Sequence, residues 1–469
     1  MRTSRTVQCD HSALEPLALS PLSPPPPGRD TSEGAERTPA DTGMSDGANT
    51  STTHKRPIVR VLTAAAAAAA VGLAGALLFL HLWNGPFGVG EVPPLLTLSS
   101  ADTSNVFDSP LHYFSLRLLD QLASAGLATP SVLNLLTFVA ASLTATMFFR
   151  KVGLANNTAI VLAVLFAFSP YHFVQGGALV TYWPIPLGGW LVVAAMRNEP
   201  LWIRPGGSRP TRTLPGVRTA LVLVAVAASG LPLLLAMTIV LVCAAAVAHF
   251  RNADGCARRR RGNVIGVGAA VAVLPIVGWL LARTTTEQIY GGGASEKIGE
   301  NSFKPLALIL PVQGHPLPVF ATLRARYDAG FDFQSGHVAL GSVASIGFLG
   351  LLVFPLLQAN KTRRIDLPPH CHAALGELAI QTWIVFLLGS FGTAAVLDVA
   401  ARGIVGHPQP WHRLSILLLL FGLAAVGLIV DATLDRLRQS RGRNSTLGRR
   451  HRRQTDLPTS HGLLQSGPA

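Results

Sequence analysis

The chain has 469 residues, of which 49% are hydrophobic and 13% are charged, and its mean hydropathy is +0.40. A soluble domain of this length carries about twice that charged fraction, so the composition excludes an ordinary soluble enzyme and indicates a membrane protein. The net charge of +14 does not indicate a nucleic-acid partner. Most of the 38 lysine and arginine residues fall in segments predicted to be cytoplasmic, as the positive-inside rule requires.

The N-terminal part of the chain contains a polar tail and a first apolar run. Residues 1–57 are rich in Pro, Ser, Thr and Gly, which predicts a disordered cytoplasmic tail. No A-x-A cleavage site follows the apolar run 61–82, and we therefore interpret this run as an uncleaved first span. In the outer segment 83–129, Arg117 and Asp120 lie on the polar face of an amphipathic stretch. These charges predict a helix along the membrane interface.

Further apolar stretches approach the length of about 20 residues that a membrane span needs. The run 218–250 is too long for one helix and short for two, and its break at Gly230-Leu231-Pro232 favours a hairpin of two short helices. The alternative is one kinked helix, which would place the basic block Arg258–Arg261 outside, so the hairpin is preferred. The remaining predicted spans are residues 131–149, 158–173, 178–196, 264–282, 340–357, 378–397 and 414–433.

Together these segments predict an all-α polytopic bundle of about ten spans in the cell membrane, with both termini cytoplasmic. The transmembrane domain covers residues 58–434 and has outer loops at 83–129 and 283–339. Residues 435–469 are arginine-rich and are predicted to form a basic, disordered cytoplasmic tail.

The four cysteines include no CxxC pair, so a disulfide framework is not expected. His370-Cys371-His372 has no second pair of metal ligands nearby in the sequence. We interpret it as a short inner loop rather than a metal site.

The span centres contain almost no Asp, Glu, Lys or Arg, which disfavours a proton- or ion-coupled transporter. Polar residues gather instead in four clusters that the predicted topology places on the outer side. These clusters contain Glu91, Asp102, Asp108 and His112; Ser169 to Phe173; Glu296, Glu300, Lys304, His315, Arg324, Arg326, Tyr327 and Asp328; and His407, Trp411, His412 and Arg413.

Most of these residues have a plainer interpretation. His172 lies among aromatic residues and could be an interfacial anchor. Arg324 and Arg326 could form a solvated helix face, and Asp102 and Asp108 could be ordinary loop carboxylates. Arg413 differs, because an arginine at the threshold of a span needs an anionic partner or a wet cavity.

Several motifs occur in an order typical of one group of membrane proteins. They are Ser169-Pro170-Tyr171-His172-Phe173 with Pro186-Leu187-Gly188, then Lys304-Pro305, Gly314-His315 and Arg324-Ala325-Arg326-Tyr327-Asp328, and finally Trp411-His412-Arg413-Leu414-Ser415-Ile416. Over about residues 105–432 the chain resembles bacterial integral membrane proteins of the GT-C glycosyltransferase type, which are often described loosely as sugar translocases. The last motif is similar to their last-span entrance, where Trp-Asn-Arg is usual.

The resemblance implies a GT-C architecture that moves a sugar from a polyprenyl-phosphate donor to a glycan acceptor at the outer membrane face. Such a transfer needs a carboxylate near the acceptor hydroxyl, often with a divalent metal such as Mg²⁺ or Mn²⁺, and a cationic clamp on the departing phosphate. The candidate catalytic residues are Asp108, Asp102 and His172. The candidate substrate-binding residues are His112, Lys304, His315, Arg326, Trp411 and Arg413.

The chain also departs from the family pattern. Gln175-Gly176-Gly177 follows the first motif where an acid and a histidine are expected, and Gln334-Ser335 stands where Asn-Glu is usual. A second class of function therefore stays open, namely a non-enzymatic or diverged protein that binds or translocates a lipid-linked glycan.

Overall fold

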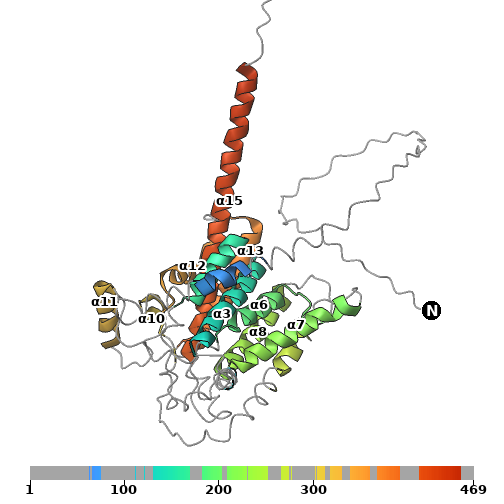
Figure 1. The fold of residues 1–469 in the computed structure, drawn as a ribbon, viewed down its shortest axis with the longest axis vertical. Coiled ribbons are helices and arrows are strands. Elements are labelled where there is room, and N and C mark those ends of the chain that lie inside the picture. Colours follow the sequence, from blue (N-terminus) through green and yellow to red (C-terminus); the bar gives the residue numbers. More distant parts are fainter. Residues whose placement is uncertain are drawn as a thin grey trace, which may run out of the picture. The chain divides into compact units, whose positions relative to one another are not determined.

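The protein is helical throughout the residues that its computed structural model describes (Figure 1). The predicted tail 1–57 and most of the two predicted outer loops lie outside this part of the chain. The described residues are 63, 66–74, 111, 121, 130–169, 182–202, 209–229, 231–251, 266–273, 276, 302, 304–311, 317–329, 339–359, 367–390 and 411–455.

Most of the helices follow the predicted apolar runs in chain order, and two shorter ones lie within the predicted outer loop 283–339. They are α3 (Pro130–Val152), α4 (Asn156–Ala167), α6 (Ile185–Met196), α7 (Arg209–Ala228), α8 (Leu231–Arg251), α10 (Pro305–Ile309), α11 (Pro318–Ala329), α12 (Ser342–Ala359), α13 (Pro369–Gly389), the 3-10 turn η4 (Trp411–Leu414) and α15 (Ser415–Thr455). The predicted all-α class is thus confirmed for the described residues.

Four helices in the described part of the chain are long and apolar enough to cross a membrane. Further apolar helices, at Asn156–Ala167, Ile185–Met196 and Thr213–Ala228, are shorter. The protein therefore has the helices of a membrane protein. The membrane-length segments are Leu233–Arg251, Ser342–Ala359, Pro369–Gly389 and Ser415–Ser440.

The apolar run 218–250 forms two helices, α7 and α8, as the break at Gly230 predicts. Contacts of the flanking segments agree with a hairpin. Trp202, which precedes α7, donates its indole N–H to the carbonyl of Gly266, which follows α8, at 2.7 Å. A single kinked helix would carry these two residues to opposite ends of the bundle.

Several helices differ from their predicted bounds, since α6 begins at Ile185 rather than at residue 178 and α7 begins at Arg209 rather than at residue 218. The helix α13 begins at Pro369 rather than at residue 378, so His370-Cys371-His372 forms its first turn and the prediction of a loop there is wrong. Proline is well suited to the first helical position, because its missing N–H would have no intrahelical partner there. The first turn of this helix is polar, so apolar length alone does not predict it.

The helix α15 continues to Thr455, whereas the sequence predicts disorder from residue 435. Its 41 residues make a helix about 60 Å long, about twice the thickness of a hydrocarbon core. An existing helix extends without a new nucleation step, since each added residue gains one hydrogen bond, and this one continues through Gly442 and Gly448. Asp435 and Arg438 add an ion pair of 3.2 Å on the same helix.

The helices α12 and α15 pack with their backbones in very close approach. A Cβ atom on Gly347 would lie 2.0 Å from the carbonyl oxygen of Gly422, and one on Gly422 would lie 2.3 Å from that of Ala344. Small residues permit such contacts between apolar helices, where van der Waals packing replaces the hydrophobic effect as the driving force. Gly350, on the same helix α12, has no neighbour within 4 Å of such a position.

We expect Gly347→Ala to destabilise the protein and Gly350→Ala to leave it unchanged or slightly stabilised. The added methyl at position 347 forces α12 away from α15, and overpacking of this kind costs about 1–3 kcal/mol. The thermal unfolding midpoint of each purified variant in detergent is the measurement. Equal midpoints for the two alanine variants would contradict the close approach of these helices.

Candidate functional site

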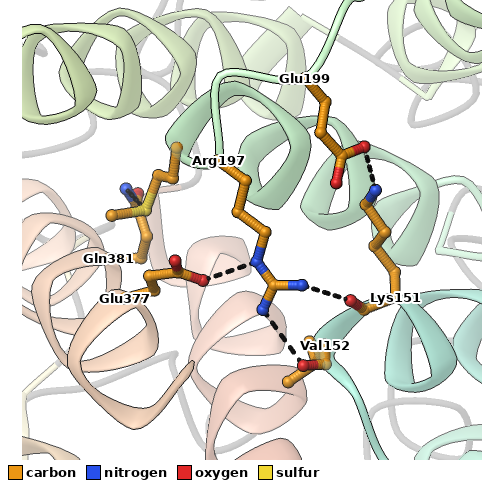
Figure 2. A network of polar contacts seen from close by, with 7 residues as sticks. Lys151, Val152, Arg197, Glu199, Glu377 and Gln381 are labelled. Atoms are coloured by element: carbon orange, nitrogen blue, oxygen red, sulfur yellow. Dashed lines mark hydrogen bonds and ion pairs between the residues drawn. The ribbon is translucent and has the colours of Figure 1, made fainter. Parts of the chain in front are cut away.

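A network of ion pairs and hydrogen bonds joins several helices at one end of the bundle (Figure 2). The Arg197 guanidinium donates to Glu377 Oε2 at 2.9 Å and to the carbonyl oxygens of Lys151 and Val152 at 2.8 and 3.1 Å. Arg197 follows α6, Glu377 belongs to α13, and the two carbonyls end α3. One side chain thus fixes three helices at one point.

The backbone beside Arg197 holds its side chain in place. Asn198 adopts a left-handed conformation with φ of 52°, and its N–H donates to Ala195 O, while the N–H of Glu199 donates to Ala194 O. This pair of hydrogen bonds is the Schellman ending of a helix, in which Asn is one of the few residues tolerated at the left-handed position. The same turn brings Glu199 to the Lys151 ammonium, with which it forms an ion pair.

Asp431 of α15 makes a separate polar contact with the start of α4, close in the chain to the end of α3. Its carboxylate accepts hydrogen bonds from the backbone N–H of Ala155, at 2.6 Å, and from the Thr158 hydroxyl. Ala155 precedes the first residue of α4, so a side chain from another helix caps this N-terminus. A carboxylate is favourable there because it meets free N–H groups and the positive end of the helix dipole.

Arg413 lies in the η4 turn directly before α15, whereas Asp431 lies near the middle of that 41-residue helix. Residues 414–430 between them include no charged side chain, and at 1.5 Å per residue they separate the two charges by about 27 Å. The η4 turn contacts α8, α13 and α15, and the Arg413 side chain is half-buried. Its charge acts on the hydroxyl of Tyr182, which is fully buried before α6.

Lys304 lies immediately before α10 and is half-buried. Loss of hydration lowers the pKa of its ammonium below the usual value. The short helix α10 is joined to the start of α12, because Leu308 O accepts a hydrogen bond of 2.9 Å from the N–H of Leu340. Gly347 of α12 packs on Gly422 of α15, and farther along both helices Phe354 and Asp431 lie beside the first turn of α13. The helices α12 and α15 therefore run in the same direction and begin at the same end. Lys304 and Arg413 therefore lie at the same end of this helix pair.

The two arginines of α11 occupy different environments. Arg324 is 1% exposed, and its Nε atom contacts both carboxylate oxygens of Asp328, at 3.0 and 2.9 Å, while Nη1 donates to Pro311 O. The prediction of a solvated face is therefore wrong for Arg324. Arg326 is exposed, as that interpretation predicts. The side chains of Leu317, Val319 and Phe320 are also exposed, so α11 buries a charge pair and presents apolar residues outward.

Only part of the predicted site lies in the described chain. Lys304, Arg326 and Arg413 are described with their side chains, and Trp411 is described by its backbone in η4. Lys304 and Arg413 share one end of the α12–α15 pair, and no contact of Arg326 with either is seen. The predicted residues outside the described part are Asp102, Asp108, His112, His172 and His315.

The residues that form the polar network were not predicted as a unit. Arg197 and Glu377 are 180 positions apart, and no local pattern pairs them. The Arg324–Asp328 pair could have been found, because oppositely charged residues at i and i+4 face each other on a helix. Within the described residues no group of three His, Cys, Asp or Glu side chains gathers that could hold a metal ion.

In its described residues the protein is all-helical, and several of its helices are long enough to span a membrane. These features define its class. The chain belongs to the DUF6311 family, since the model of that family, described as "Domain of unknown function (DUF6311)", matches residues 75–414. That match includes Lys304, Arg326 and Arg413. No curated protein and no solved structure matches the chain.

We expect Arg324→Gln to loosen α11 and Arg326→Gln to leave it intact. The first change removes the partner of a mostly buried carboxylate, which costs about 1–3 kcal/mol. Local opening should then speed chymotrypsin cleavage at Phe320 and Tyr327 about tenfold, as followed by mass spectrometry. Arg326→Gln is the matched control, and equal cleavage of the two variants would contradict a structural role for Arg324.

Proposed function

We propose that the protein spans the cell membrane about ten times, with both termini in the cytoplasm. In support, Lys151, Arg197 and Glu377 belong to segments that the sequence assigns to the cytoplasmic side, and all three join the polar network. Asp431 lies at the cytoplasmic end of the predicted span 414–433 and caps α4. In the same arrangement Lys304 and Arg413 fall on the outer side. The exposed apolar residues of α11 fit a helix that meets the outer membrane interface.

We further propose that the protein is a GT-C-like glycosyltransferase, which transfers a sugar from a polyprenyl-phosphate donor to a glycan acceptor at the outer face. The observation that carries this proposal is Arg413. It is a half-buried cation in a turn packed against three helices, about 27 Å along the chain from the cytoplasmic carboxylate Asp431. A cation held at this depth suits the phosphate of a lipid whose chains lie in the membrane.

The proposed roles follow from the bonds that change. The acceptor hydroxyl attacks the anomeric carbon of the sugar, and the bond from that carbon to the phosphate oxygen breaks, so the phosphate leaves with the electron pair. Asp108 or Asp102 takes the hydroxyl proton, as a general base must. Arg413 and Lys304 bind the departing phosphate and stabilise its growing charge. His172, His112, His315, Arg326 and Trp411 would line the site.

No step of this proposal passes through a metal. Mg²⁺ or Mn²⁺ prefers several carboxylate oxygens, and the described residues gather no such group. Asp102 and Asp108 lie outside them.

A second candidate is a non-enzymatic protein that binds or translocates a lipid-linked glycan. This candidate is favoured because each carboxylate in the described residues already forms an ion pair or caps a helix. Glu199 pairs with Lys151, Glu377 with Arg197, Asp328 with Arg324 and Asp435 with Arg438, while Asp431 caps α4. Transfer would then need a carboxylate from another part of the chain.

We expect Arg413→Ala and Asp108→Ala each to lower product formation about a hundredfold, and Arg413→Lys to retain part of it. Mass spectrometry of glycans in membranes from cells producing each variant is the measurement. Arg438→Ala, an exposed position on α15, is the control and should match the wild type. Normal product from both Arg413→Ala and Asp108→Ala would reject this site.

Turnover of a lipid-linked donor by the purified wild type would separate the two candidates. The transferase releases the polyprenyl phosphate, whereas a binding protein leaves the donor intact.

A further inference from the structure

A second cationic cluster lies beside the polar network, around the ring of Trp190 on α6. The Lys151 ammonium lies 5.2 Å from the ring centroid, and the Arg218 guanidinium carbon lies 4.0 Å from it. Both distances are within the range of cation–π attraction. The two cations come from different helices, α3 and α7, and Trp190 itself is 8% exposed.

Among the described residues, the charge of this cluster is not balanced. Glu199 forms an ion pair with Lys151 and also attracts Arg218, so one carboxylate serves two cations. Arg197 has Glu377 as its own partner, and both Arg197 and Arg218 repel the Lys151 ammonium. An added anion would relieve this repulsion.

The position of Arg218 identifies the kind of anion. Its side chain is exposed, and the residues that share its face of α7, Leu214 and Leu221, are 66% and 67% exposed. An exposed leucine stripe of this kind suits contact with lipid chains. Arg218 also begins the apolar run 218–250, where the proposed topology places the cytoplasmic membrane boundary. Lipid phosphates lie at that depth, and basic pockets between helices on this side bind anionic head groups.

We propose that Lys151 and Arg218 form a binding site for the phosphate of an anionic phospholipid of the cytoplasmic leaflet. This inference rests on the proposed membrane placement, but it does not depend on sugar transfer. The lipid phosphate accepts hydrogen bonds from the two cations, and its acyl chains lie along Leu221, which follows Arg218 within the apolar run of α7. The ring of Trp190 attracts both cations and so helps to hold them in place. The site is separate from Arg413.

The test uses the full-length protein, purified and delipidated in a neutral detergent, with no sugar donor present. Its thermal unfolding midpoint is followed while dioleoylphosphatidylglycerol or dioleoylphosphatidylcholine is titrated into the micelles. We expect the anionic lipid to raise the midpoint of the wild type more than the zwitterionic lipid does. Equal effects of the two lipids would overturn the proposal.

Variants of matched charge localise the site. We expect Arg218→Gln to weaken the apparent affinity for phosphatidylglycerol about tenfold, because a charged hydrogen bond is lost, and Arg218→Lys to restore most of it. Arg438→Gln makes the same charge change at a position 75% exposed on α15 and should keep the wild-type preference. An undiminished preference in Arg218→Gln would overturn the proposal.

Two further measurements test the site if Arg218→Gln does not fold, and test whether a soluble anion occupies it instead of a lipid. Glu199→Gln removes the competing carboxylate and should strengthen the phosphatidylglycerol preference; a weaker or unchanged preference would count against the site, even where Arg218→Gln fails to fold. Inorganic phosphate should not reproduce the effect of the lipid. A full stabilisation by inorganic phosphate would assign the site to a soluble anion and overturn the lipid as its occupant. Neither outcome bears on Arg413 or on donor turnover, so the two proposals fail separately.

Discussion

The Arg197 guanidinium imposes the main constraint on the described helices. A guanidinium at the end of an apolar bundle must find partners, because an unpaired charge there is costly. Arg197 meets this need with two carbonyls that end α3 and with Glu377 of α13. Replacing such a pair with apolar residues is often neutral, whereas removing one partner is expensive. The main effect of the pair is thus to fix the positions of three helices relative to one another along their axes.

This constraint divides the bundle into two unlike ends. At the Arg197 end, ion pairs and the Asp431 cap join α3, α4, α6, α13 and α15. Toward the other end, the close approach of Gly347 and Gly422 holds α12 to α15 without any charge. At the first end Arg197 is engaged in structural contacts, while Lys151 and Arg218 form the proposed lipid site. Arg413 and Lys304 lie at the second end, where the proposed lipid-linked sugar would bind.

The sequence predicted the helices better than their ends. Apolar length located α3, α12 and the start of α15 within a few residues, and the charge argument predicted the α7–α8 break correctly. Apolar length failed where helices continue into polar residues, as at His370 of α13 and beyond Thr433 of α15. The polar contacts depended on tertiary structure, since Arg197 and Glu377 meet across 180 positions. Among the candidate site residues, sequence alone could not tell the buried Arg324 from the exposed Arg326.

The two proposed functions differ in one feature, the source of a base. A phosphate clamp at Arg413 and Lys304 serves a transferase and a glycan-binding protein equally well, so cations do not separate them. A base does, because only transfer requires that a hydroxyl proton be accepted. The five described carboxylates each hold a cation or cap a helix, and freeing any of them would cost the bundle a structural contact. In the proposed transferase the base would therefore come from the outer loops, above all from Asp102 or Asp108 of segment 83–129.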